Sequence, residues 1–244
     1  MSTPSLTQAL GLFFQAHPWH GVTPGEKAPE IVTSYIEMVP TDVVKYEVDK
    51  NTGILKLDRP QRYSNQPPCL YGFIPRTLCD TRVGERCSSR LGRSGISGDQ
   101  DPIDICVLTE KPIQHGAILV EAIPIGGFRM IDSNQADDKI IAVLKNDNVY
   151  GGWKDLKDVP PQLIDRLRHY FLTYKAMPDS PTPPVEIAET YDRAEALETI
   201  KKAFASGYGN TSWAAKDTDL DCLHDDPDFQ KLVGLDQEIG RAHV

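Results

Sequence analysis

The feature that most constrains this chain is an acidic run at residues 98–104, GDQDPID, which leads directly into the apolar segment 105–108, ICVL. Because side chains alternate along an extended backbone, Asp99 and Asp101 are predicted to share one side of it. Pro102 fixes φ and removes a backbone donor, so the chain is predicted to turn or to lie at an edge there. The segment after Asp104 has no polar face and therefore predicts a buried strand.

Carboxylates at this density indicate a bound cation. Three of them within six residues repel one another unless a cation lies among them, and Asp104 adjoins a buried strand, where an unpaired charge is costly. Hard oxygen ligands favour Mg²⁺, Mn²⁺ or Ca²⁺ over zinc. A solvated acidic loop is the alternative. An EF-hand loop does not fit, since position 104 would have to be Gly, and an aspartyl-nucleophile phosphatase usually places Asp-x-Asp after a strand.

Composition narrows the class of protein. The 244 residues fit one domain with extensions or two small domains. A net charge of −9 argues against a nucleic-acid partner, but it leaves room for a small phosphate substrate because bound cations reverse the local sign. The five cysteines are odd in number and lack C-x-x-C spacing, which predicts reduced thiols. With no apolar window long enough to span a membrane and no signal sequence, we expect a soluble, cytoplasmic protein with no membrane partner.

The first half of the chain predicts β structure with two extra segments. Strands are expected at 31–39, 43–49 and 54–59, the last two joined as a hairpin whose polar face carries Lys45 and Glu47, with water as the alternative partner of that face. Residues 60–98 are predicted to be irregular: a stiff apolar loop, then a basic, flexible insertion with four arginines. The alternative for this insertion is a lid that admits an anionic substrate.

The N-terminal segment predicts a short amphipathic helix around residues 6–14, followed by His17-Pro18-Trp19-His20-Gly21. The paired histidines are candidate metal ligands, but an extension packed on the body or on a neighbouring subunit is favoured.

The second half predicts further strands and then helices. Strands are expected within 117–131 and at 139–144, and the polar loop between them carries Asp132 and Asp137. That loop is a second place for metal carboxylates, although Asp is also ordinary in turns. Helices are predicted at 159–175, where the pattern makes Tyr174 a core residue, and at 193–204, with an acidic segment beyond 207.

Together these positions resemble the signature of the soluble family I inorganic pyrophosphatases. The signature run is Asp99-x-Asp101-Pro102-x-Asp104, and the resemblance extends in order from about Tyr35 to Phe204. It takes in Ile36-Glu37-Met38-Val39-Pro40, Lys45-Tyr46-Glu47, Asp58-Arg59, Cys69-x-Tyr71-Gly72-Phe73-Ile74, Asp132…Asp137-x-Lys139 and Tyr174-Lys175.

The resemblance implies an α+β, mainly β fold: a closed five-stranded β-barrel of the oligonucleotide/oligosaccharide-binding type with flanking C-terminal helices. This domain would span residues 30–207, with an insertion at about 76–97. Residues 1–29 would be an N-terminal extension, and residues 208–244 an acidic C-terminal extension. A homo-oligomer is expected, of a size that the extensions leave open.

The resemblance also implies hydrolysis of inorganic pyrophosphate with Mg²⁺, or Mn²⁺ as a substitute. Metal ligands would be Asp99, Asp104 and Asp137, with Asp132 and Glu47 completing the sites. Asp101 would be the general base, with Tyr71 beside the nucleophile and Glu37 at the pocket rim. Phosphate oxygens would be held by Lys45, Arg59, Lys139, Tyr174 and Lys175. These roles suit two-metal hydrolysis, in which cations activate water and cationic side chains stabilise the leaving phosphate.

One departure and two alternatives stay open. Pro67 stands where the family pattern has a Tyr, which puts one outer substrate contact in doubt. The alternatives are a phosphoanhydride hydrolase for nucleotides, with the arginine-rich insertion as the base- or sugar-binding surface, and a non-catalytic phosphate-binding barrel.

Overall fold

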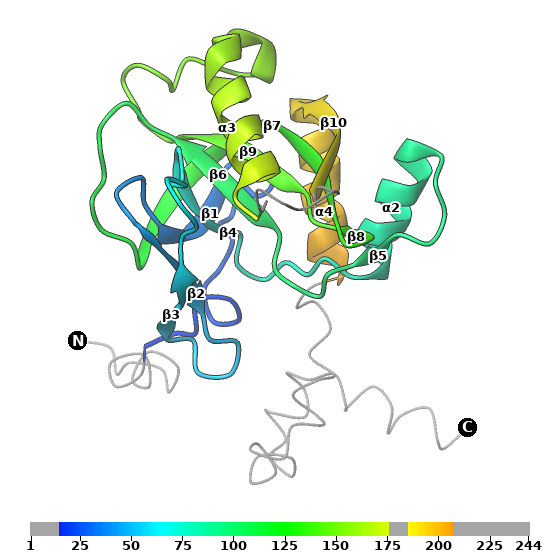
Figure 1. The fold of residues 1–244 in the computed structure, drawn as a ribbon, viewed down its shortest axis with the longest axis horizontal. Coiled ribbons are helices and arrows are strands. Elements are labelled where there is room, and N and C mark those ends of the chain that lie inside the picture. The colour runs from blue at the N-terminus through cyan, green and yellow to red at the C-terminus, as the bar shows by residue number, and fades with distance from the viewer. Residues whose placement is uncertain (1–14, 176–184, 207–244) are drawn as a thin grey trace, which may run out of the picture.

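Five strands close into a ring at the centre of the molecule (Figure 1). In ring order they are β1 (Val32–Met38), β4 (Leu70–Phe73), β6 (Asp104–Leu108), β9 (Lys139–Leu144) and β7 (Ile118–Asp132), and β7 pairs back onto β1. β6 and β9 run parallel, whereas the other four contacts of the ring are antiparallel. The closed five-stranded architecture and the mainly β class are as the family resemblance implies. The computed structural model describes residues 15–175 and 185–206, so the predicted helix at 6–14 and the acidic segment beyond 207 lie outside it.

The strands at the centre are apolar on both faces because each face meets a different core. Ile105 and Val107 of β6 belong to one buried cluster, which also takes in residues of α2 (Thr81–Leu91) and α4 (Arg193–Ser206). Cys106 and Leu108 belong to the other, against α3 (Pro161–Thr173). The period of two along a strand therefore places α3 against one core and α2 and α4 against the other. No helix among the described residues is long and apolar enough to cross a bilayer.

β1 and β4 approach so closely that only glycine fits at position 72. Gly72 pairs with Ile36, and a Cβ built on it would lie 1.9 Å from the carbonyl oxygen of Tyr35. A side chain there would force the two backbones apart, and the ring with them.

β7 extends well past the ring. Its far half pairs with β10 (Val185–Asp192) and with the short β8 (Gln135–Ala136), which in turn pairs with β5 (Ser97–Gly98). A short 3-10 helix, η1 (Leu156–Asp158), precedes α3. The helices predicted at 159–175 and 193–204 are confirmed as α3 and α4, whereas β10 was not predicted.

The prediction that residues 60–98 are irregular is wrong, because α2 lies within them. Asp80 caps its first turn by accepting from the backbone N–H of Arg82 at 2.8 Å, and Gly92 ends it with a φ of 62°. The insertion is not a lid, since its arginines bind β10 and α4. Arg86 makes a bidentate pair with Glu195, at 2.6 and 3.0 Å, and Arg93 makes one with Glu186, at 2.7 and 2.8 Å.

The predicted hairpin is confirmed as β2 (Val44–Val48) and β3 (Leu55–Pro60). These two strands form a sheet of their own, separate from the ring, and lie on the opposite side of the molecule from α2 (Figure 1). The hairpin must therefore be positioned by contacts other than the hydrogen-bond ladder of the ring.

Candidate active site

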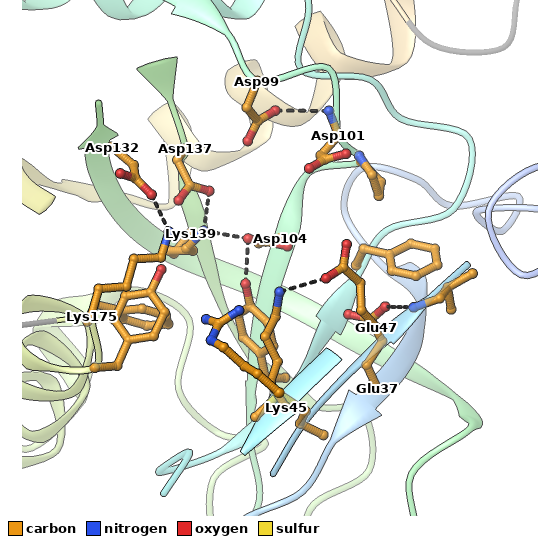
Figure 2. Close-up of a pocket in the computed structure, with 18 of the residues that line it drawn as sticks. Glu37, Lys45, Glu47, Asp99, Asp101, Asp104, Asp132, Asp137, Lys139 and Lys175 are labelled. Atoms are coloured by element: carbon orange, nitrogen blue, oxygen red, sulfur yellow. Dashed lines mark hydrogen bonds and ion pairs between the residues drawn. The ribbon is translucent and has the colours of Figure 1, made fainter. Parts of the chain in front are cut away.

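A cleft of about 260 Å³ lies between the hairpin β2–β3, the acidic loop before β6, the β7–β9 connection and the end of α3. This volume is just below the range usual for drug-sized ligands, so the cleft suits a small molecule. All of the site residues predicted from the sequence line it (Figure 2). They are Glu37, Lys45, Glu47, Arg59, Tyr71, Asp99, Asp101, Asp104, Asp132, Asp137, Lys139, Tyr174 and Lys175. Pro67, by contrast, is buried and does not line the cleft.

The acidic run is a tight turn, not an extended strand, so the prediction that Asp99 and Asp101 share one side of an extended backbone is wrong. Gln100 between them has a φ of +64°, and the backbone N–H of Asp101 donates to Oδ1 of Asp99 at 3.0 Å. Backbone bonds between Cys79 and both Gln100 and Asp101 fix the turn. The Asp side chain, which readily bonds the backbone two residues on, thus sets the local shape.

Lys139 lies between two of the carboxylates. The parallel register places Asp104 beside Lys139, whose ammonium contacts both Asp104 and Asp137 (Figure 2). Burial lowers the pKa of Lys139, but the charges of Asp104 and Asp137 outweigh it and raise that pKa well above its usual value. The Tyr71 hydroxyl donates to Oδ2 of Asp104 at 2.5 Å, and burial keeps the pKa of Tyr71 well above its usual range. Lys139 is therefore charged and Tyr71 protonated at neutral pH.

The end of α3 brings a second lysine to the cleft. Lys175 contacts Asp132, the last residue of β7 (Figure 2). Tyr174 caps the helix, and its ring packs on Tyr170 and Phe171, with centroids 5.5 and 6.0 Å away. The pattern-based assignment of Tyr174 to the core is therefore half right: one side of the ring packs in the core, and the residue lines the cleft.

The hairpin supplies the opposite wall. Lys45 Nζ lies 2.9 Å from Glu47 and 3.4 Å from Asp58, and Asp58 also contacts Arg59. Lys45, Glu47 and Arg59 line the same cleft as the acidic loop, so the polar face of this hairpin meets the carboxylates there rather than only water.

Glu37 is buried instead of lying at an open rim. Only 6% of it is exposed, and its Oε1 accepts from the backbone N–H of Val48 at 2.7 Å. Burial raises the pKa of Glu37 to about 8, partly offset by that hydrogen bond. The side chain thus links β1 to the hairpin.

Sequence reasoning missed several residues that line the cleft. Lys50, in the hairpin turn, contacts Asp101, and Trp19, Gln61 and Tyr170 also line the cleft. A turn residue has no periodicity to show where its side chain points, so Lys50 carried no signal. Trp19 was noted only as part of an extension, although a Trp flanked by two histidines was a cue.

The donor set suits hard divalent cations. Seven carboxylates line the cleft, and burial together with the charge of Asp137 raises the pKa of Asp99 to about 8, so a cation beside these groups would relieve their repulsion. In the described residues, no three His, Cys, Asp or Glu side chains surround a common point as a metal site. Lysine ammonium groups lie against these carboxylates instead: Lys139, Lys175 and Lys45. The residues present fit the chemistry of the ion.

A closed ring of five strands beside a small cleft lined by many carboxylates, lysines and an arginine defines a class: proteins that handle a small phosphate anion together with divalent cations. The comparisons with known proteins are specific. The family model for inorganic pyrophosphatase matches residues 34–207. An inorganic pyrophosphatase of Chlamydia muridarum is 50% identical over 191 residues, 77% of this chain and 91% of that protein.

Solved structures agree. The inorganic pyrophosphatase of Thermus thermophilus superposes with a TM-score of 0.65 at 31% identity, covering 79% of this chain and 98% of its own. That of Coxiella burnetii gives 0.63 at 29% identity, covering 77% and 100%. This chain belongs to the inorganic pyrophosphatase family. Membership implies a divalent metal cofactor and pyrophosphate as substrate.

Proposed function

We propose that this protein hydrolyses inorganic pyrophosphate to two orthophosphates, with Mg²⁺ as its cofactor and Mn²⁺ as a substitute. The observation that carries the proposal is the meeting of seven carboxylates and five cationic side chains around one small cleft, all within the residues that the family model matches. Asp99, Asp104 and Asp137 would hold the catalytic ions, and Asp132 and Glu47 would complete the sites. When bound, the ions supply a water of lowered pKa and shield the negative charge of the substrate.

Asp101 acts as the general base. Its side chain is 41% exposed, so it can reach a water in the cleft, and Lys50 holds it in place. The oxygen of the attacking water forms a bond to one phosphorus while its proton passes to Asp101. Tyr71 lies beside this position, where the hydroxyl orients Asp104.

The leaving phosphate is held by Lys45, Arg59, Lys139, Tyr174 and Lys175. As the bridging P–O bond breaks, charge grows on the leaving oxygen, and nearby ammonium and guanidinium groups stabilise it. A proton then reaches that phosphate, and both products depart with no covalent intermediate. Glu37 supports these phosphate-binding side chains indirectly, because it accepts a hydrogen bond from the backbone of Val48 and so holds the hairpin in place.

The position of the insertion argues against a nucleotide hydrolase. The arginines of the insertion, which the sequence offered as a base- or sugar-binding surface, pair with β10 and α4, and α2 lies on the far side of the molecule from the hairpin (Figure 1). The presence of Asp101 with its neighbours argues against a non-catalytic binding protein. We take residues 30–207 as the catalytic unit and expect a homo-oligomer, for which exposed Val43, Ile54 and Leu57 offer contact surface.

The test is phosphate release from pyrophosphate with Mg²⁺, with EDTA, and with ATP as the rival substrate. Fast release that requires Mg²⁺ and is much slower from ATP supports the proposal. Release from ATP at the same rate would favour the nucleotide hydrolase, and no release from either substrate would favour a binding protein.

A further inference from the structure

The hairpin β2–β3 carries several cleft residues, yet its two strands form no ladder with the ring. Lys45, Glu47 and Arg59 lie on it, and Lys50 in its turn reaches Asp101 across the cleft. A two-stranded sheet alone is marginally stable, so the position of these side chains depends on whatever anchors the hairpin. Part of the anchor comes from a segment that lies upstream of the residues matched by the family model, which begin at residue 34.

This segment, residues 17–21, is called the strap here. One side of it is fixed to the body of the molecule. The Trp19 indole donates to the carbonyl of Thr77 at 2.8 Å, and the Trp19 carbonyl accepts from the backbone N–H of Arg76 at 2.9 Å. Thr77 in turn accepts from the backbone N–H of Ile103, next to the acidic loop, at 2.9 Å. Trp19 is only 7% exposed.

The other side of the strap holds the hairpin. His17 Nε2 lies 3.1 Å from the carbonyl oxygen of Lys50. The backbone N–H groups of Trp19 and His20 both donate to Nδ1 of His17, so the ring proton of neutral His17 is assigned to Nε2, which can donate to that carbonyl.

Packing reinforces this contact. The turn of the hairpin is so close that a Cβ on Gly53 would lie 2.8 Å from Cδ2 of His17 and 2.9 Å from Pro18. Trp19 also shares a buried cluster with Val48 of β2, and Leu55 of β3 packs against that cluster.

We propose that His17 and Trp19 are positioning residues, which tie the hairpin to the acidic loop and so set the substrate affinity of the cleft. The strap bridges Thr77 on the body and Lys50 on the hairpin, so loosening it lets the hairpin move away from the carboxylates. Re-closing the hairpin then costs free energy whenever substrate binds. Because this cost falls equally on the bound substrate and on the transition state, it raises KM and leaves kcat nearly unchanged.

The variant that tests this is His17→Asn. Its side chain can still accept from the backbone N–H groups of the strap, but it is too short to reach Lys50. His17→Gln is the conservative partner, because its amide nitrogen can extend to the position of Nε2. His169→Asn, at an exposed position on α3, controls for the loss of a histidine.

This inference rests on the proposed function for its kinetic readout, so hydrogen exchange is measured beside it. His17→Asn is expected to raise KM for pyrophosphate by about twofold to tenfold, the range for one lost hydrogen bond, with kcat within about twofold of wild type. Backbone amides of residues 44–60 should exchange faster, while those of β7 stay unchanged. His17→Gln and His169→Asn should behave as wild type.

Unchanged KM and unchanged exchange in His17→Asn would overturn the proposal. Equal acceleration in the hairpin and in β7 would also overturn it, since the histidine would then support the whole fold. If wild type does not hydrolyse pyrophosphate, the proposed function fails on its own account, and the exchange of residues 44–60 still decides whether the strap holds the hairpin.

Discussion

Two clusters of charged side chains meet at a pair of chain neighbours, Asp137 and Asp138, and they are built differently. Asp137 belongs to the cleft cluster, with Asp104 and Lys139. Asp138 faces the other way, into an arginine cluster in which Arg129 contacts Glu189 and Glu195 and lies 3.9 Å from Asp138. Arg86 of the insertion joins through Glu195, and Tyr191 donates to Asp138 at 3.2 Å.

The difference lies in the cation and in access to the cleft. The arginine cluster is closed: Arg129 is fully buried, and planar guanidinium groups hold the carboxylates in fixed directions. In the cleft cluster the carboxylates line an open cavity, and the compact, rotatable lysine ammonium can give way to another cation. The two clusters have a similar density of charge, but the arginine cluster stabilises the fold and the cleft cluster is available for chemistry. Four experiments test this contrast.

The largest expected effect is on activity in the cleft. Asp101→Asn should lower kcat for pyrophosphate hydrolysis by about 10²- to 10⁴-fold, because the amide cannot accept the proton of the attacking water. The unfolding free energy and Mg²⁺ binding, measured by urea denaturation and calorimetry, should change little. A wild-type rate would remove Asp101 as the base.

The next effect is on stability in the arginine cluster. Arg129→Met should lower the unfolding free energy by about 3–5 kcal/mol, because Glu189, Glu195 and Asp138 lose a buried partner. Urea denaturation measures it, and kcat of the folded fraction should stay near wild type. If Arg129→Met kept the wild-type unfolding free energy but lost its activity, the arginine cluster would not have the purely structural role assigned to it.

Metal addition and removal should act through the cleft cluster. Mg²⁺ at about 100 times its Kd should raise the unfolding free energy by about 2.7 kcal/mol, since it binds the native state alone, and EDTA should reverse the gain and abolish activity. Asp137→Asn should reduce this stabilisation, whereas Arg129→Met should keep it. An identical Mg²⁺ effect in wild type and Asp137→Asn would show that the ion binds elsewhere.

The smallest effect belongs to an exposed pair at the edge of the arginine cluster. The hydrogen bonds from Arg93 hold the pKa of Glu186 below its usual value. A carboxyl whose pKa is lowered on folding adds stability above its unfolded pKa, and the contribution is lost as pH falls through the folded pKa. Glu186→Gln should therefore lower the melting temperature by no more than about 3 °C at pH 7, and by less at pH 3. A deficit that grows on acidification would contradict this sign.

Many of the strands could be predicted because their signals are local, whereas the closed ring and most of the cleft residues were expected only from the resemblance to the family. Alternation along 43–49 and the continuous apolar runs at 105–108 and 140–144 define strands without reference to the rest of the chain. The acidic run likewise carries its chemistry in a few consecutive residues, but Lys45, Lys139 and Lys175 lie far from it in the sequence and were assigned through the resemblance.

The failures share a cause in long-range pairing. The insertion contains several arginines and glycines and was predicted to be flexible. Asp80 and Gly92 could have been recognised as the ends of a helix. The carboxylates that bind its arginines lie far along the chain, on β10 and α4. β10 itself was missed because its Glu186 and Glu189 do not follow a period of two: the strand is irregular between Ile187 and Glu189, and both carboxylates pair with arginines of the insertion. Lys50 and Trp19 act through contacts that no local pattern encodes.

The closeness of β1 and β4 at Gly72 has a consequence for genetic variation. Even a methyl group at this position would overlap the Tyr35 carbonyl, and every residue other than glycine carries at least that much. If position 72 is varied to all amino acids and the library is selected for function, only glycine codons should survive at this position. Gly72 nevertheless takes no part in the chemistry. A position that accepts no substitution can therefore be one where two strands of a closed ring approach closely. Sequence conservation at such a position would reflect backbone packing and not catalysis.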